Sequence, residues 1–251
     1  MIKYLRLGVG ILPHLLKASP WIGSYNRKRK KLDLKKRYDK TRRLINVAFD
    51  HFRTDIYIDG EENLKDGPYL IVANHQAVMD PVIMIKAFEN PMSFVAKAEL
   101  KKVPWFGKII SLLDSEFIER DNLRQEIKVI RHVGESLEQN EKSWVIFPEG
   151  TRTKDKDMNV QEFKAGAIKA AYTSKKSILP IAIFGTHRII NRKLHKKRYA
   201  VQLSILKPIE YEEFSKYSTT DFAPILHDIV SEQVKILKKR DEEFLKQKKY
   251  R

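Results

Sequence analysis

Asn74-His75-Gln76-Ala77-Val78-Met79-Asp80 follows the apolar run at 69–73, and it is the most informative stretch of the chain. The run has the length and composition of a buried strand. Pro81 comes directly after Asp80, which predicts a helix with Asp80 as its N-cap and proline at its first position. The segment is therefore predicted to be a strand, a short loop and a helix. His75 would lie in the loop at the carboxyl end of the strand, where α/β proteins place their functional residues.

The pairing of His75 with Asp80 suits acid–base chemistry. A carboxylate that accepts a hydrogen bond from one imidazole nitrogen fixes the tautomer and makes the other nitrogen a better base. Taken alone, such a pair is more often a loop histidine near a helix cap than a catalytic pair. A second motif is needed to favour the catalytic interpretation.

That second motif is Phe147-Pro148-Glu149-Gly150-Thr151-Arg152, which ends another strand-like run at 143–147. Proline and glycine at these positions predict a turn. Gly150 lets the backbone approach a ligand closely, and Arg152 offers a planar group that fits a phosphate. On its own, this motif is also compatible with an ordinary turn that carries a surface arginine.

Together, the two motifs resemble those of the glycerolipid acyltransferase family, in particular its bacterial members that acylate 1-acylglycerol 3-phosphate. The similar segments follow the family's order over roughly residues 55–210. They include AKAEL at 96–100, PWFG at 104–107, FIER at 117–120, FKAGA at 163–167 and ILPIAI at 178–183. One position departs from the family pattern, because Asp114 stands where the family usually carries glycine.

The resemblance implies an enzyme that moves a fatty acyl group from a thioester of coenzyme A or acyl carrier protein to the free hydroxyl of lysophosphatidic acid, which gives phosphatidic acid. Another lysophospholipid or glycerol 3-phosphate is the alternative acceptor. His75 would be the base and Asp80 its supporting carboxylate. The residues expected to bind substrate are Asn74, Lys97, Arg120, Glu149, Gly150, Thr151, Arg152 and Lys164.

The chain offers no sign of a protein nucleophile, a metal site or a cofactor. It contains no cysteine and no G-x-S-x-G motif, and its histidines are scattered. A His/Asp pair without a protein nucleophile favours direct attack by the substrate's own hydroxyl. Among the other histidines, only His187, just past the 178–184 run, is a candidate for the site.

The net charge of +17 lies at the two ends of the chain. Residues 1–53 hold 15 Lys/Arg and 3 Asp/Glu, residues 235–251 hold 8 and 3, and the middle holds 26 of each. A nucleic-acid-binding protein would carry its basic face on the folded module, so this distribution disfavours that class. Basic ends beside a neutral middle favour attachment to an anionic membrane surface.

The first 53 residues predict a basic, amphipathic two-helix membrane anchor. Residues 2–17 place apolar side chains at helical spacing, with Pro13 expected to kink or end the helix. This stretch is too short and charged to span a bilayer, which needs roughly 20 apolar residues, and suits a helix in the interface. A second helix is expected at 32–52, and the resemblance suggests that the two pair within one leaflet. The protein is therefore expected at the cytoplasmic face of the membrane, peripheral or monotopic.

Residues 54–251 predict a single catalytic domain with a basic C-terminal helix. The alternation of strand-like and helix-like stretches indicates an α/β fold with a mostly parallel sheet flanked by helices. Residues near Trp105 and Phe106 are interpreted as core, with an acyl-chain groove as the alternative. Strands are expected near 54–59, 69–73, 92–96, 116–118, 143–147, 178–183 and 199–206, and helices near 81–89, 122–139, 164–174 and 221–248. A membrane-binding scaffold without activity is the remaining alternative for the whole chain.

Overall fold

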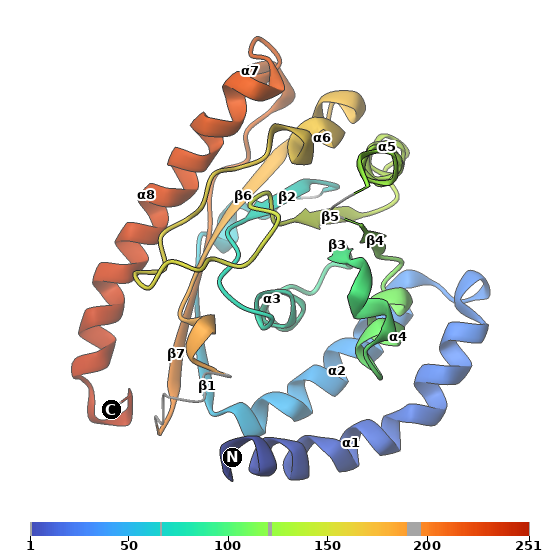
Figure 1. Cartoon of the computed structure of the whole chain (residues 1–251), viewed down its shortest axis with the longest axis vertical. Coiled ribbons are helices and arrows are strands. Elements are labelled where there is room, and N and C mark those ends of the chain that lie inside the picture. Colours follow the sequence, from blue (N-terminus) through green and yellow to red (C-terminus); the bar gives the residue numbers. More distant parts are fainter. Residues whose placement is uncertain (1, 66, 120–121, 190–196, 251) are drawn as a thin grey trace.

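The computed structural model describes residues 2–65, 67–119, 122–189 and 197–250, without the side chains of 2–12, 48 and 50–52. In this part of the chain, seven strands form one sheet in the order β1-β7-β6-β2-β5-β3-β4 (Figure 1). Neighbouring strands are parallel except β6 and β7. The strands are β1 (Thr54–Asp59), β2 (Leu70–Ala73), β3 (Met92–Lys97), β4 (Glu116–Ile118), β5 (Ser143–Ile146), β6 (Ile178–Phe184) and β7 (Tyr199–Ile205). The predicted mostly parallel sheet is confirmed.

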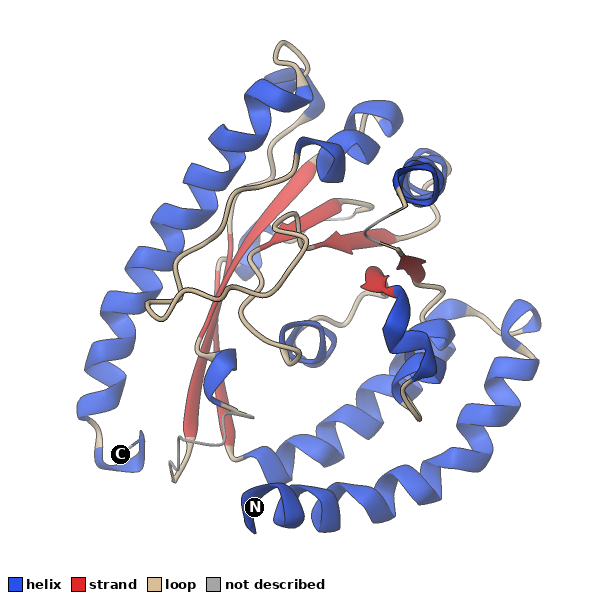
Figure 2. Cartoon of the chain, in the orientation of Figure 1, coloured by secondary structure: helices blue, strands red, loops and turns tan. Residues whose placement is uncertain are grey.

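Helices cover both faces of the sheet (Figure 2). One core joins the sheet to α2 and α3, and a second core joins the opposite face to α5, α6 and α8. In β2, Ile71 faces the first core and Leu70 and Val72 face the second. A strand that is buried on both faces is apolar throughout, which explains why the run at 69–73 predicts a strand so clearly. The helices are α1 (Ile2–Arg27), α2 (Leu34–Phe52), α3 (Asp80–Ala87), α4 (Phe106–Leu112), α5 (Leu123–Glu138), α6 (Lys169–Ser174), α7 (Tyr211–Phe214) and α8 (Thr219–Lys246).

The N-terminal helix is longer than the sequence predicts. It continues to Arg27 with Pro13 and Pro20 inside it, so of the two effects expected at Pro13, a kink or an end, the end does not occur. A proline removes a single backbone donor, and packing of the next turns can offset that loss. Here the later turns contribute Ala18 and Ile22 to a small core with Leu112 of α4. None of the helices in the described chain is long and apolar enough to cross a membrane.

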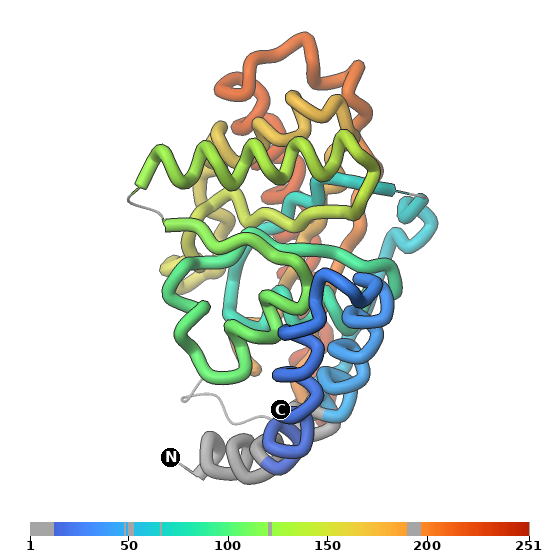
Figure 3. The backbone as a smooth tube through the Cα atoms, turned by 90° about the vertical axis from the view of Figure 1, so that its right-hand side faces the viewer, coloured from blue at the N-terminus to red at the C-terminus, as the bar shows by residue number. Residues whose placement is uncertain are grey.

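The two N-terminal helices lie side by side and pack on the rest of the chain (Figure 3). Tyr38 and Ile45 of α2 belong to the same core as the sheet and α3. The buried Arg37 donates to the carbonyl oxygen of Leu112 at 2.5 Å and to the carboxylate of Asp114 at 2.6 Å. The two helices therefore contact each other and the rest of the chain, and their predicted embedding in one leaflet stays a prediction.

Asp114, the departure from the family pattern, has a φ of +48°. Glycine is the usual residue in this left-handed region, and aspartate is among the residues that tolerate it best. Its carboxylate also pairs with Arg29 at 3.3 Å. The aspartate therefore keeps the left-handed turn before β4 and uses its charge to tie the N-terminal segment to the sheet.

The residues around Trp105 divide between core and surface. Trp105 and Ile109 are partly buried against the core of Ala18, Ile22 and Leu112, and the indole nitrogen of Trp105 donates to the hydroxyl of Ser19 at 2.6 Å. Phe106, at the start of α4, is exposed. The core interpretation therefore holds for Trp105 and Ile109 and is wrong for Phe106. Helix α4 and the short turns beside it were not predicted, because they contain too few residues to show a helical spacing of apolar side chains.

Candidate active site

Asn74 joins β2 to β6 where the His75 loop begins. Its amide nitrogen donates to the carbonyl oxygen of Ile183 at 3.0 Å, and its amide oxygen accepts from the Ile183 backbone N–H at 2.7 Å. The residue is only 1% exposed. Since both polar atoms are used and the side chain is buried, Asn74 positions the loop, and its expected substrate contact stays a prediction.

Asp80 is the centre of the hydrogen bonds in this loop. Its Oδ2 atom accepts from His75 Nδ1 at 2.7 Å, from the Gln76 N–H at 2.7 Å and from the Ala77 N–H at 2.9 Å. Its Oδ1 atom accepts from the hydroxyl of Thr186. A fully buried carboxylate needs donors on both oxygens, and this arrangement supplies four.

The role predicted for Asp80 as a helix cap is corrected by one residue. Helix α3 begins at Asp80 itself, and Met79 occupies the N-cap position without a side-chain hydrogen bond. Pro81 is in the first turn, as expected. The aspartate carboxylate is directed back to the loop because the His75 ring and two loop N–H groups are there to be satisfied.

The imidazole of His75 is held in one orientation by two contacts. Nδ1 is bonded to Asp80, and the ring stacks on Phe147 with centroids 4.2 Å apart and an interplanar angle of 23°. With its proton on Nδ1, donated to the carboxylate, the ring presents the lone pair of Nε2. Nε2 makes no hydrogen bond to the described residues, so it is available to a substrate hydroxyl.

Glu149 fixes the His75 loop to the loop after β5. Its Oε1 atom accepts from the backbone N–H of His75 at 2.5 Å, and Oε2 accepts from the Gln161 N–H at 3.0 Å. The Thr153 N–H also donates to the His75 carbonyl oxygen at 2.8 Å. Glu149 is 5% exposed and both its oxygens are occupied, so it positions the two loops, and its expected substrate contact stays a prediction.

Burial raises the pKa of the Glu149 carboxyl to about 7, against the two backbone donors, which lower it. The folded protein therefore retains a proton that the unfolded chain releases near the ordinary value of 4.5. This proton contributes stability at low pH, and the contribution is lost as the pH rises through about 7. We expect the Tm of wild type to fall relative to that of Glu149→Gln between about pH 5 and pH 8. Parallel Tm curves over that range would contradict the shift.

Gly150 and the exposed Lys164 lie in contact in the loop after β5. Gly150 has a φ of +68°, and a Cβ placed there would lie 3.0 Å from Cε and 3.1 Å from Nζ of Lys164. The lysine side chain thus lies across the glycine, which has no side chain to block it. Arg152 is exposed and Thr151 is partly buried, both directly before the Thr153 N–H that donates to His75. The structure therefore places Lys164 against Gly150, while Arg152 comes one residue before the Thr153 N–H that bonds to His75.

Lys97, a third predicted cation, makes no described contact with His75. Lys97 is exposed at the end of β3 and pairs with Glu99 at 2.5 Å. Arg120 lies outside the described residues. Parallel strands end at one edge of the sheet, so Lys97 and the His75 loop share that edge, with β5 between β3 and β2.

His187 lies beside the His75 loop, on the turn after β6. Its Nδ1 is 3.3 Å from Oε1 of Gln76, which also accepts from the Gly185 N–H at 3.0 Å. Burial, and then the charge of Arg188, lower the pKa of His187 to about 4. The ring is therefore neutral at physiological pH and contributes packing and a hydrogen-bonding group near the site.

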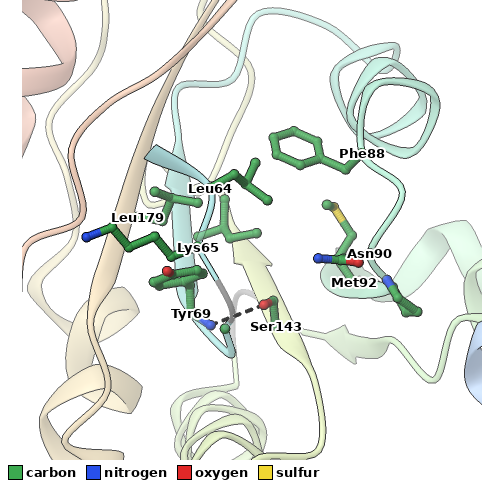
Figure 4. Close-up of a pocket in the computed structure, with 11 residues that line it drawn as sticks. Leu64, Lys65, Tyr69, Phe88, Asn90, Met92, Ser143 and Leu179 are labelled. Carbon is green, nitrogen blue, oxygen red and sulfur yellow. Dashed lines mark hydrogen bonds between the residues drawn. The ribbon is translucent and has the colours of Figure 1, made fainter. Parts of the chain in front are cut away.

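A small pocket at the other end of the sheet is separate from this chemistry (Figure 4). It is lined by residues at the amino ends of strands, such as Tyr69, Met92 and Ser143, and the Ser143 hydroxyl accepts from the Tyr69 N–H at 3.1 Å. His75 and Glu149 follow the carboxyl ends instead. Across the described residues, no group of three or more His, Cys, Asp or Glu side chains is arranged to hold a metal ion.

Three residues that support the site were not predicted: Gln76, Gln161 and Thr186. Each acts through a contact with a residue distant in sequence, such as the bond between Thr186 and Asp80 across 106 positions. Gln76 stands within the first motif, and its position there was the only available signal. The other two carry no local pattern that marks them.

Known proteins share both the sequence pattern and the fold of this chain. A protein-family model described as "Acyltransferase" matches residues 55–184. A probable 1-acyl-sn-glycerol-3-phosphate acyltransferase of Mycoplasma pneumoniae is 32% identical over 200 residues, covering 74% of each chain. The 1-acyl-sn-glycerol-3-phosphate acyltransferase of Saccharomyces cerevisiae is 30% identical over 182 residues, which cover 72% of this chain and 60% of the yeast protein.

A solved structure extends the similarity to nearly the whole chain. It is the crystal structure of the 1-acyl-sn-glycerophosphate (LPA) acyltransferase, PlsC, from Thermotoga maritima. The two chains superpose with a TM-score of 0.72 at 28% sequence identity, covering 94% of this chain and 98% of the other. The similarity therefore includes the N-terminal helices as well as the sheet.

Proposed function

Because the chain belongs to the acyltransferase family, we propose that it transfers a fatty acyl group from an acyl thioester to the free hydroxyl of 1-acyl-sn-glycerol 3-phosphate, giving phosphatidic acid. The observation that carries the proposal is the buried Asp80 bonded to His75 Nδ1, which leaves Nε2 without a described partner. The names of the relatives support the acceptor.

In the proposed reaction, Nε2 of His75 accepts the proton of the lipid hydroxyl as its oxygen attacks the thioester carbonyl carbon. Asp80 stabilises the imidazolium that forms, by the hydrogen bond to Nδ1. When the tetrahedral intermediate collapses, the carbon–sulfur bond breaks and the imidazolium returns the proton to the departing thiolate. The substrate supplies the nucleophile, so the protein needs none of its own.

The phosphate of the acceptor is proposed to bind to Arg152 and Lys164, with the backbone at Gly150 and Thr151 shaping the site. Lys164 lies against Gly150 in the loop that Glu149 holds against His75, and Arg152 is exposed two residues after Gly150. A phosphate bound there places the hydroxyl of the same molecule near Nε2, and such positioning lowers the barrier. Lys97, on the same edge of the sheet, and Arg120 are proposed as secondary contacts.

Arg152→Ala and Lys164→Ala are each expected to raise the KM for lysophosphatidic acid by about 10-fold or more, because a charge-assisted hydrogen bond contributes about 1.5–3 kcal/mol. kcat should change much less, since the phosphate contact is present before and during reaction. Initial rates over a series of acceptor concentrations would measure this. The exposed Lys169→Ala is the matched control, and an unchanged KM in both site variants would refute the phosphate site.

The basic N-terminal segment is proposed to bind the cytoplasmic face of the cell membrane, where lysophosphatidic acid resides. Deleting residues 1–53 is a poor test, since it would expose the core shared by Tyr38 and Ile45. Lys28, Lys30 and Lys31 are exposed and make no ion pair with described residues, whereas Arg29 pairs with Asp114. Changing these three lysines to glutamate therefore leaves the packing intact.

The triple lysine variant is expected to lose most of its binding to anionic vesicles, because each lysine near such a surface contributes about 1 kcal/mol. Sedimentation with vesicles of phosphatidylglycerol and phosphatidylcholine would measure the bound fraction. Lys175, Lys207 and Lys216, which are also exposed, provide a control with the same change in net charge. Equal loss in both variants would argue against a specific anchoring segment.

The function is tested by the product. The protein is incubated with a long-chain acyl-coenzyme A, or with the same chain on acyl carrier protein, and with isotopically labelled lysophosphatidic acid in micelles. Labelled phosphatidic acid is the expected lipid product with at least one donor. Product only from glycerol 3-phosphate or from another lysophospholipid would replace the proposed acceptor, and no product from any pair would favour the inactive scaffold.

A further inference from the structure

The turn after β6 carries a hydroxyl that completes the hydrogen bonds of Asp80. We propose that Thr186 is a positioning residue for the His75–Asp80 pair, an inference that rests on the proposed function. Thr186 belongs to the short helical turn Thr186–Arg188 and is fully buried. Its hydroxyl donates to Oδ1 of Asp80, while the other three donors all bond to Oδ2.

The donors are divided unevenly between the two oxygens of Asp80, and this gives the threonine hydroxyl a role that the other donors do not share. Among the described residues, Thr186 is the sole donor to Oδ1. Without its hydroxyl, that oxygen would be buried and unsatisfied, which destabilises the carboxylate orientation seen here. The carboxylate can regain donors only by rotating, and rotation weakens the bond that fixes the imidazole of His75. The hydroxyl therefore acts on the reaction through Asp80 and need not touch the substrate.

The position of Thr186 is itself fixed from two sides. Gly185 precedes it with a φ of +98°, and a Cβ there would lie 2.5 Å from the carbonyl oxygen of Ala200, so the close approach requires glycine. The Gly185 N–H donates to Gln76, next to His75. On the other side, the buried Arg188 donates to Asp241 of α8 at 2.6 Å. The turn is thus tied to the His75 loop and to the longest described helix, and it presents the hydroxyl from a rigid support.

Three variants test the proposal. Thr186→Val keeps the shape and removes the donor, and Thr186→Ser keeps the donor. Thr41→Val is the matched control, because Thr41 is also fully buried and donates its hydroxyl within α2 to the Arg37 carbonyl oxygen at 2.9 Å. We measure kcat, the acceptor KM and Tm for each variant, with the full chain in the lipid micelle assay.

Thr186→Val is expected to lower kcat by about 10- to 100-fold, the usual effect of removing a group that orients a functional side chain, with KM changed by less than about threefold. Thr186→Ser should recover kcat to within about threefold of wild type. Thr41→Val should keep wild-type kcat for a similar loss of Tm. A wild-type kcat in Thr186→Val, or a loss in Thr186→Ser as large as in Thr186→Val, would overturn the proposal, as would an equal loss in Thr41→Val.

A second measurement does not depend on turnover. The amide hydrogens of Gln76 and Ala77 bond to Asp80, so their exchange with deuterium is expected to be faster in Thr186→Val and unchanged in Thr41→Val. If wild type shows no acyl transfer, the proposed function fails and the exchange rates alone decide the role of Thr186. Equal exchange in Thr186→Val and wild type would then overturn it.

Discussion

Replacement of His75 with alanine is expected to lower kcat for acyl transfer by about 10³-fold or more, because it removes both the base for the lipid hydroxyl and the acid for the thiolate. The side chain is partly exposed and its ring contacts are those with Asp80 and Phe147. The loop is also held by backbone bonds to Glu149 and Thr153, which alanine retains. Activity should therefore be lost without loss of fold or of vesicle binding.

The rate of phosphatidic acid formation measures this effect, with circular dichroism and vesicle sedimentation as checks on fold and binding. His132→Ala is the control, since this histidine is exposed on α5 and lies 3.5 Å from Glu116, away from the loop. Turnover in His75→Ala within about tenfold of wild type would show that another group accepts the proton.

Replacement of Asp80 with asparagine is expected to lower kcat by about 10²- to 10⁴-fold. An asparagine offers one oxygen to four donors, so at least one bond now made by Asp80 is lost, and the neutral amide cannot stabilise an imidazolium. The ring of His75 would then favour neither the orientation nor the tautomer that presents Nε2. The acceptor KM should change little, because the phosphate contacts lie on the other loop.

The same kinetic assay, with Tm, measures the Asp80 variant. Asp55→Asn is the control: Asp55 also carries a carboxylate with a side-chain partner, Arg198, but it lies on the edge strand β1. A fall in Tm is expected in both variants, and a fall in kcat only at Asp80. An Asp80→Asn enzyme with wild-type kcat would show that the carboxylate is structural.

The sheet could be predicted because its central strands are buried on both faces. All the side chains of β2 are buried, and so are those of β5 after its first residue. Such buried runs are apolar without interruption. Helix boundaries were less predictable. Pro13 was expected to kink or end α1, but tertiary packing of later turns decides where that helix ends. α4 was missed because its seven residues are too few to show a helical period.

The residues of the site also differ in whether the sequence could predict them. The residues that meet the substrate in the proposed reaction stand in local motifs, which the sequence displays. The residues that hold them in place do not stand in such motifs. Thr186 donates to Asp80 and the backbone N–H of Gln161 donates to Glu149, and both donors come from other segments. Asn74 and Glu149 show the converse, since they stand in the motifs and yet their side chains are buried and bonded to backbone. A motif therefore identifies the site more reliably than it assigns each residue's contact.

Direct transfer of the acyl group, without an acyl-enzyme intermediate, is tested most directly by the release of thiol. Acyl-coenzyme A or acylated carrier protein is mixed rapidly with stoichiometric amounts of enzyme, and thiol is measured before lysophosphatidic acid is added. Direct attack by the lipid hydroxyl predicts no early release, followed by continuous release and phosphatidic acid formation once the acceptor is present. A burst of about one thiol per enzyme without acceptor would reveal an acyl-enzyme intermediate and contradict direct transfer by the His75–Asp80 pair.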